Sequence, residues 1–209
     1  MSIKWIPENV IQHYLINPKN QDKISINETF NVDCVVSLNL DIGCGNGHFL
    51  VDIAKENPDR FYIGIEIKFE RVCKTISKLS KRNIENVRMY HGDALNFINK
   101  NLGDNIIDNV YYNFPDPWPK RRHHKKRLFN AEFLNILCRI LKHNGVFTCA
   151  TDHKEYLEWM LGFIEKDEKF EHVFAEKISN NIPGYHSTLF EEKWREMGKK
   201  IYYFRIIKK

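Results

Sequence analysis

The sequence of 209 residues lacks the cysteine spacing of a zinc site or a disulfide framework: its five cysteines include no C-x-x-C pair. Reduced, mostly buried thiols are therefore expected, as in cytosolic proteins. No stretch approaches the roughly 20 apolar residues of a membrane-spanning helix. The N-terminal MSIKWIPENVIQHYL has no continuous apolar run, which argues against a signal peptide. These absences predict a cytoplasmic protein with no membrane segment and no bound metal.

Excess charge is confined to one short stretch. The formal net charge is +5, and residues 120–127, KRRHHKKR, contain six of the 32 Lys and Arg residues. Without those six, 26 basic residues face 27 acidic ones, so the rest of the chain is nearly neutral. A concentrated positive patch on a neutral body predicts a polyanionic partner such as a nucleic acid.

Hydrophobic periodicity predicts strands that alternate with helices. The predicted strands are residues 35–43, 60–67, 87–94, 106–114, 146–152, 170–176 and 200–209, and the predicted helices are 48–58, 69–83, 95–102, 130–145, 153–168 and 188–198. This alternation is typical of an α/β fold with a mostly parallel sheet and helices on both faces. We predict one domain over residues 37–209, preceded by an N-terminal extension, residues 1–36, that lies on the domain or is partly mobile.

A glycine turn, D-I-G-C-G-N-G, ends the first predicted strand at residues 41–47. Gly43, Gly45 and Gly47 let the backbone turn sharply and approach a ligand that a Cβ atom would keep away. His48 stands where a dinucleotide fingerprint requires its third glycine. The spacing therefore disfavours a pyrophosphate cradle, and with it a dehydrogenase.

Acidic residues end three successive predicted strands: Asp41, Glu66 and Asp93. Ligands of such sheets bind at the carboxyl ends of the strands, where an acid in the position of Glu66 can accept both ribose hydroxyls. Asp93 is placed to accept from the exocyclic amine of adenine. The three acids and the glycine turn predict an adenosine pocket without phosphates. S-adenosylmethionine fits this pocket, since its sulfonium and ammonium groups would pair with Asp41.

The segment NFPDPWP, residues 113–119, joins the fourth predicted strand to the basic run. Its three prolines fix φ and restrict the residues before them, so the loop is stiff and can hold Asp116 in place. A rigid turn with Trp118 as a lid would explain the prolines but neither the acid nor the run. The run would seat a nucleic acid by its phosphates while Asp116 meets one base.

In this order, LDIGCGNGHFL, GIEI, GDA, NFPDPWPKRRHHKKRL, TDH and TLFEEKW resemble the bacterial tRNA (guanine-N7)-methyltransferase family, from about residue 38 to the C-terminus. The resemblance implies a Rossmann-like class I methyltransferase fold, with a seven-stranded sheet whose last strand is antiparallel. It implies methyl transfer from S-adenosylmethionine to N7 of a guanosine in the tRNA variable loop, guanosine 46. The partner is then tRNA, and the protein is either a monomer or a homodimer.

The resemblance also implies roles for individual residues. Asp41, Glu66, Asp93 and Asp116 match the cofactor-contacting acids of the family, and Asp116 also matches its proposed catalytic residue. The positions that match its guanosine contacts are Lys120, Asp152 and the segment from Thr188 to Glu191. The positions that match its RNA-binding stretch are Arg122, His123, His124, Lys125, Lys126 and Arg127.

The sequence departs from the family at two positions. The family often has Glu where Asp41 stands, and it usually has Tyr where Phe190 stands. The shorter acid at position 41 would reach its ligand through water. Any hydroxyl contact from position 190 is absent.

Two other functions are open. Methyltransferases of exocyclic amines carry an Asn/Asp-Pro-Pro-aromatic tetrad, whereas this chain reads N-F-P-D-P-W. A non-catalytic RNA-binding module on the same fold is expected to have lost acids of the cofactor pocket, whereas Glu66, Asp93 and Asp116 are all present. Both features favour methylation of the guanine ring.

Overall fold

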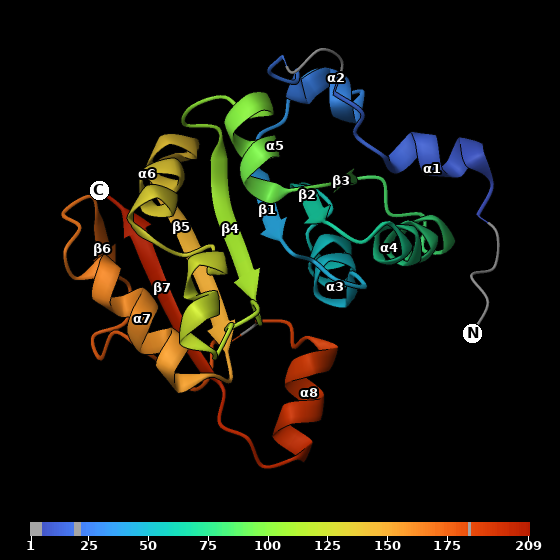
Figure 1. Cartoon of the computed structure of the whole chain (residues 1–209). Helices are drawn as coiled ribbons and strands as arrows, with labels where there is room; N and C mark the ends of the chain where they lie inside the picture. Colours follow the sequence, from blue (N-terminus) through green and yellow to red (C-terminus); the bar gives the residue numbers. More distant parts are fainter. Residues whose placement is uncertain (1–5, 19–21, 184) are drawn as a thin grey trace.

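The computed structural model describes residues 6–18, 22–183 and 185–209, without the side chains of Leu189 and Phe190. Seven strands form one sheet in the order β3-β2-β1-β4-β5-β7-β6 (Figure 1). β7 is antiparallel to both of its neighbours, and the pairs among β1 to β5 are parallel. The strands are β1 (Leu38–Ile42), β2 (Phe61–Glu66), β3 (Val87–His91), β4 (Ile107–Asn113), β5 (Leu141–Thr151), β6 (Phe170–His172) and β7 (Tyr202–Lys208). This arrangement confirms the predicted fold class.

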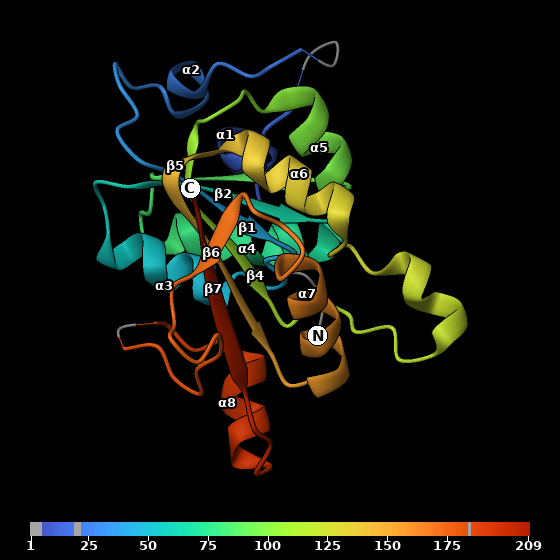
Figure 2. The same cartoon turned by 90° about the vertical axis from the view of Figure 1, so that its left-hand side faces the viewer.

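Helices cover both faces of the sheet (Figure 2). The described helices are α1 (Glu8–Tyr14), α2 (Ile26–Phe30), α3 (His48–Glu56), α4 (Phe69–Lys81), α5 (Ala94–Asn101), the 3₁₀ helix η1 (Arg121–Lys126), α6 (Ala131–Ile140), α7 (Lys154–Ile164) and α8 (Leu189–Glu196). Side chains of α5, α6 and α7 fill the core on one face, and those of α3 and α4 fill the other. None of the described helices is both long and apolar enough to cross a bilayer.

The side chains of β1 alternate between the two faces, as expected for a strand. Leu38, Leu40 and Ile42 belong to the core under α5 and α6. The side chains of Asn39 and Asp41 point to the opposite face of the strand. Both residues are buried although they are polar. Asn39 is satisfied by the carbonyl of Phe61 and by the amide of Asn109. The Oδ1 atom of Asp41, by contrast, has no hydrogen-bond partner in the described part of the chain, and this residue lies at the candidate site.

Several predicted element boundaries differ from those of the structure, and two of these differences have a clear cause. The helix predicted over residues 130–145 ends at Ile140, because Leu141 already pairs with Ile107 of β4. The apolar spacing of this segment fits a helix and a buried strand equally well, so the pairing decides. The strand predicted over residues 170–176 ends at His172, and the chain then turns through Lys177 at φ 62°.

The described part of the N-terminal extension packs on the edge of the sheet. The Ile16 amide donates to the Met89 carbonyl of β3 at 2.8 Å, and Tyr14 and Phe30 are buried. Helices α1 and α2 in this segment were not predicted, because their apolar residues are few. Residues 1–5 and 19–21 of the predicted extension lie outside the described residues.

Arg88 of β3 fastens this N-terminal segment. It is 6% exposed, and its Nε atom donates to the Thr29 carbonyl at 3.0 Å. Its guanidinium carbon lies 5.1 Å from the centre of the Phe30 ring and 6.0 Å from that of Tyr14. The cation thus joins both helices of the segment to the sheet edge.

We expect Arg88→Met to lower the free energy of unfolding by about 1–3 kcal/mol, because the partly buried carbonyl of Thr29 loses its donor. Urea denaturation measures this change. Arg60→Met, at an exposed arginine, is the control and should stay within about 0.5 kcal/mol of the wild type. Equal stability of the two variants would show that Arg88 does not anchor the segment.

Candidate active site

Two adjoining cavities lie at the carboxyl ends of β1, β2, β3 and β4. The first, of about 400 Å³, is bounded by Glu66, Asp93 and Trp118. The second, of about 320 Å³, lies between the glycine turn after β1 and the start of α8. Five residues line both cavities: Gly43, Arg71, Asn113, Phe114 and Asp116. The fold therefore brings the four predicted acids, which are far apart in sequence, to one place.

Asp41 is the most deeply buried of these acids. Its side chain lines the second cavity, the residue is 2% exposed, and its Oδ1 atom has no hydrogen-bond partner among the described residues. Burial, and then repulsion from Glu66, raise the pKa of Asp41 from its ordinary 3.8 to about 8. The charged form of Asp41 is costly here without a countercharge, so this position suits a ligand that carries positive charge.

Glu66 holds the glycine turn in place from the end of β2. Its Oε2 atom accepts from the Gly45 amide at 3.0 Å, and its Oε1 atom accepts from the Lys68 amide at 2.9 Å. Arg71 lies one turn into α4, with Nη1 3.7 Å from the same carboxylate. Each carboxylate oxygen keeps acceptor capacity for a further donor, as a ribose would require.

The three glycines of the turn serve different purposes. Gly43 and Gly45 have φ of +72° and +59°, and a Cβ atom at either would point into open space. They give a sharp turn, in a conformation that glycine adopts without strain, and its backbone lines the cavity. At Gly47 a Cβ atom would come within 2.3 Å of the Thr75 side chain. Gly47 lines the second cavity, and it also allows α3 to start close against α4.

Asp93 caps α5 at the end of β3. Its Oδ1 atom accepts from the Asn96 amide at 2.8 Å, which satisfies one free donor of the helix. The residue is exposed and lines the first cavity. The helix cap thus fixes a carboxylate at the place where the sequence predicts an adenine contact.

Backbone strain brackets Asp116 in the proline-rich loop. Phe114 has φ of 50° and Trp118 has φ of 44°, a left-handed conformation that is rare for bulky residues. Both precede prolines, which disfavours helical conformations further. Each such residue costs about 1–3 kcal/mol and persists where its surroundings hold it. The Phe114 amide donates to the Ala150 carbonyl of β5 at 2.8 Å, which fixes one end of the loop.

The basic run forms η1, which projects from the body of the sheet (Figure 2). Arg122, Lys125 and Lys126 are exposed, and His123 and His124 are partly buried. The Lys126 ammonium lies 4.6 Å from the centre of the Trp118 ring. Lys126 therefore lines the first cavity together with Asp116 and Trp118, and the exposed Arg122 and Lys125 belong to the same short helix.

Arg127 is placed differently from the other residues expected to bind RNA. Its side chain is 1% exposed. It donates to the Pro117 carbonyl at 2.8 Å and to Glu155 of α7 at 2.9 Å. In this arrangement the guanidinium is not available to a phosphate.

The predicted guanosine contacts are not all at the cavities. Of these, Thr188 lines the second cavity, and its hydroxyl caps α8 by accepting from the Glu191 amide at 3.0 Å. Glu191 is buried and accepts from Arg195 and from the Tyr203 hydroxyl. Asp152 accepts from Lys199 at 3.0 Å, and Lys120 is exposed at the start of η1. The side chain of Phe190, the second departure from the family, lies outside the described residues.

Among the residues that were not predicted, three matter for the geometry of the site: Arg71, Asn113 and Tyr185. Arg71 and Asn113 line both cavities, and the Asn113 Oδ1 atom accepts from the Tyr185 hydroxyl at 2.7 Å. The Asn113 amide nitrogen is buried without a partner among the described residues. Tyr185 lies in a polar loop and packs on Phe49, with ring centres 5.0 Å apart. Asn113 could have been predicted as a site residue, because it ends a predicted strand. Tyr185 could not, because its position depends on tertiary packing.

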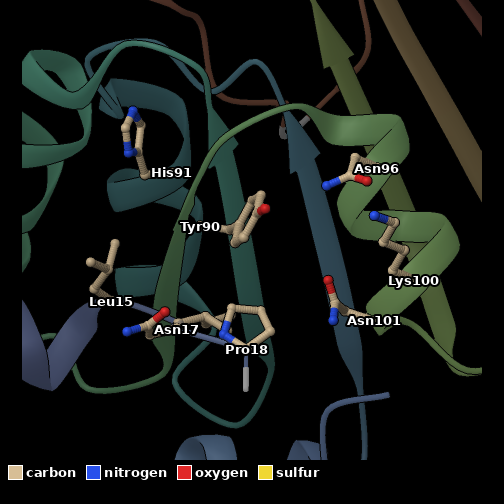
Figure 3. A pocket seen from close by; sticks show the side chains of 9 residues that line it. Leu15, Asn17, Pro18, Tyr90, His91, Asn96, Lys100 and Asn101 are labelled. Carbon is tan, nitrogen blue, oxygen red and sulfur yellow. The ribbon is translucent and has the colours of Figure 1, made fainter. Parts of the chain in front are cut away.

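A further cavity, of about 350 Å³, lies apart from these residues, between residues 15–18, the end of β3 and α5. Figure 3 shows Asn96 and Lys100 of α5 on one side and Asn17 and Pro18 on the other. None of the predicted site residues lines it. No group of three or more His, Cys, Asp or Glu side chains that could hold a metal ion occurs in the described part of the chain.

Comparison with known proteins bears on the family and the fold. Residues 36–204 match the family described as "Putative methyltransferase". The chain is 35% identical over 210 residues to the tRNA (guanine-N(7)-)-methyltransferase of Chlamydia felis (strain Fe/C-56), covering 100% of this chain and 89% of that protein. It is 31% identical to the enzyme of the same name from Thermotoga maritima, covering 92% of this chain and 61% of that protein.

Solved structures share the fold at low sequence identity. An rRNA methylase from Streptococcus thermophilus has a TM-score of 0.57 at 15% identity, over 86% of this chain and 90% of that one. An antibiotic-related methyltransferase has a TM-score of 0.60 at 19% identity, over 91% and 98%. These likenesses support the class I methyltransferase fold, and the match over nearly the whole sequence shows that the chain belongs to the bacterial tRNA (guanine-N7)-methyltransferase family.

Proposed function

We propose that this protein transfers a methyl group from S-adenosylmethionine to N7 of a guanosine in tRNA, and that the target is guanosine 46 of the variable loop. The observation that carries the proposal is the pair of adjoining cavities, which have Asp116 in their shared wall and Asp41, Glu66 and Asp93 around them. The choice of guanosine 46 follows from the family resemblance.

The cofactor pocket is proposed to lie along the ends of β1, β2 and β3. When bound, S-adenosylmethionine supplies an electrophilic methyl group on a positively charged sulfur. Glu66 would hold the ribose hydroxyls, and Asp93 would accept from the adenine amine. Asp41 would face the positive end of the cofactor, which suits a carboxylate that is buried with one oxygen unpaired. Gly43 and Gly45 leave room for the ligand against the backbone.

Methylation at N7 of guanine requires positioning more than base catalysis. N7 has a lone pair in the ring plane and carries no proton, so no group needs to remove one. Alignment of reacting atoms can contribute about 7–11 kcal/mol to lowering a barrier. Asp116 would accept from N1–H and from the exocyclic amine of guanine, and it would stabilise the positive charge that develops on the ring. Adenine has no donor at N1, so the same contact would select guanine.

The tRNA is proposed to be held by the exposed cations of η1. Phosphate contacts position a nucleic acid without reading its sequence. The target base takes part in tertiary pairing of the folded tRNA, and extruding it costs a few kcal/mol. Contacts from Arg122, Lys125 and Lys126 to the backbone would offset that cost.

The direct test is to incubate the protein with S-adenosylmethionine and an unmodified tRNA transcript, then to reduce the RNA with borohydride and cleave it with aniline. This treatment cuts chains at N7-methylguanosine. We expect one cut, at position 46. Methyl incorporation without a cut would place the reaction on another atom. No incorporation across several tRNAs would instead indicate an RNA-binding module.

We expect Asp116→Asn to lower the turnover number by about a hundredfold or more, because the amide cannot stabilise the developing charge. Steady-state kinetics with saturating tRNA and cofactor measure the change. Asp59→Asn, at an exposed aspartate outside both cavities, is the control. Near-normal turnover of Asp116→Asn would reduce Asp116 to a structural residue of the loop.

Asp41 predicts an unusual pH dependence of stability. Its pKa is about 8 in the folded protein and 3.8 ordinarily, so between these values the folded chain holds a proton that the unfolded chain has released. The free energy of unfolding contributed by Asp41 therefore falls as the pH rises from about 4 to 8, and it is level above that window. Urea denaturation at several pH values tests this.

Asn at position 41 is neutral in both states, so Asp41→Asn should remove this part of the slope. The variant should also be more stable than the wild type at pH 8. If the two proteins showed the same pH dependence between pH 4 and 8, Asp41 would not be the titrating group.

A further inference from the structure

Arg127 ends the basic run, yet its guanidinium points into the protein. We propose that Arg127 is a positioning residue, which holds the loop that carries Asp116 and does not contact tRNA phosphates. The inference rests on the proposed function, because it assumes that Asp116 meets the target base.

The contacts of Arg127 enclose it on several sides. Its Nε atom donates to the Pro117 carbonyl at 2.8 Å, and its Nη2 atom donates to Glu155 Oε1 at 2.9 Å. The guanidinium carbon lies 5.0 Å from the centre of the Tyr156 ring and 4.9 Å from that of Trp159. A planar cation with a fixed fork of donors suits this site, and the flexible ammonium of lysine does not.

The contact with Pro117 falls where the loop needs support. Pro117 lies between Asp116 and Trp118, and Trp118 has a strained φ of 44°. The other strained residue, Phe114, is fixed by its bond to the Ala150 carbonyl. The loop is thus held at both ends, by β5 on one side of Asp116 and by Arg127 on the other.

The other side of the clamp is α7, which starts just after β5. Glu155, Tyr156 and Trp159 all belong to this helix, and the Trp159 indole donates to the Phe129 carbonyl at 2.9 Å. Asp152, a predicted guanosine contact, lies between β5 and α7. Arg127 therefore fixes Asp116 relative to the part of the chain that carries Asp152.

The exposed cations of the same segment make a phosphate contact from Arg127 unnecessary. Lys120, Arg121, Arg122, Lys125 and Lys126 are all exposed, whereas the Arg127 side chain is 1% exposed. To reach a phosphate, Arg127 would have to leave the Pro117 carbonyl and two aromatic rings. It would also leave Glu155 without its closest cation.

The test is Arg127→Lys, measured in three ways with an unmodified tRNA transcript. We expect the single-turnover rate at saturating tRNA and cofactor to fall about ten- to a hundredfold, because the loop is displaced. Hydrogen exchange at the amides of Phe114, Asp116 and Trp118 should become faster. For Arg127→Gln, which removes the charge as well, we expect the dissociation constant for tRNA and its salt dependence to stay as in the wild type.

Arg139→Lys is the matched control, because it shows the effect of replacing an arginine with similar hydrogen bonds far from the cavities. Arg139 also donates to a carboxylate, Asp104 at 2.9 Å, and to the carbonyls of Leu102 and Ile98. It lies near the start of β4, at the opposite end of the sheet from the cavities. This variant should lose stability without changing the methylation rate or the exchange of the loop.

Lys125→Ala shows what the loss of a phosphate contact looks like. The affinity of this variant for tRNA should depend less on salt, and the slope of log affinity against log salt should be smaller by about 0.7–0.9. If Arg127→Gln showed this smaller slope, or Arg127→Lys kept the full single-turnover rate, the inference would be wrong. If the wild type formed no N7-methylguanosine, the proposed function would fail, whereas the hydrogen exchange would still decide whether Arg127 holds the loop.

Discussion

Parallel pairing of β1 with β2 and β4, and of β2 with β3, is the constraint on which the rest of the structure depends. Since these strands run the same way, their last residues meet at one edge of the sheet. Four different strands carry the parts of the site at their ends: Asp41, Glu66, Asp93 and the proline-rich loop. They form one site only because the pairing registers are fixed by the buried apolar side chains beneath them.

The site is built from local arrangements that the core has to hold. Asp41 is buried, with one oxygen that no other described residue pairs, and Phe114 and Trp118 have strained backbones. Each is unfavourable by itself, and the surrounding packing and hydrogen bonds maintain all three. A site arranged in this way needs little conformational change when a ligand of matching charge and shape binds. The unfavourable arrangements lower the stability of the ligand-free protein.

Much of the fold and of the site could be predicted from the sequence. The acids Asp41, Glu66 and Asp93 were predictable because each follows a clear apolar strand, and strand ends define the binding edge. The helix that ends at Ile140 was predicted too long, since only the pairing of Leu141 with Ile107 separates helix from strand there. The inward direction of Arg127 was not predictable. A run of basic residues gives no sign of which member meets the aromatic rings of a distant helix.

The pairing of the N-terminal segment with β3 has a consequence for behaviour in solution. β3 is the last strand on its side of the sheet, and unpaired strand edges invite pairing with other molecules. Leu15 forms an isolated parallel bridge to Met89, and the Ile16 amide donates a hydrogen bond to the Met89 carbonyl. The other edge strand, β6, is three residues long, which limits its own pairing. The N-terminal segment therefore covers part of the β3 edge, which limits the pairing of that edge with other molecules.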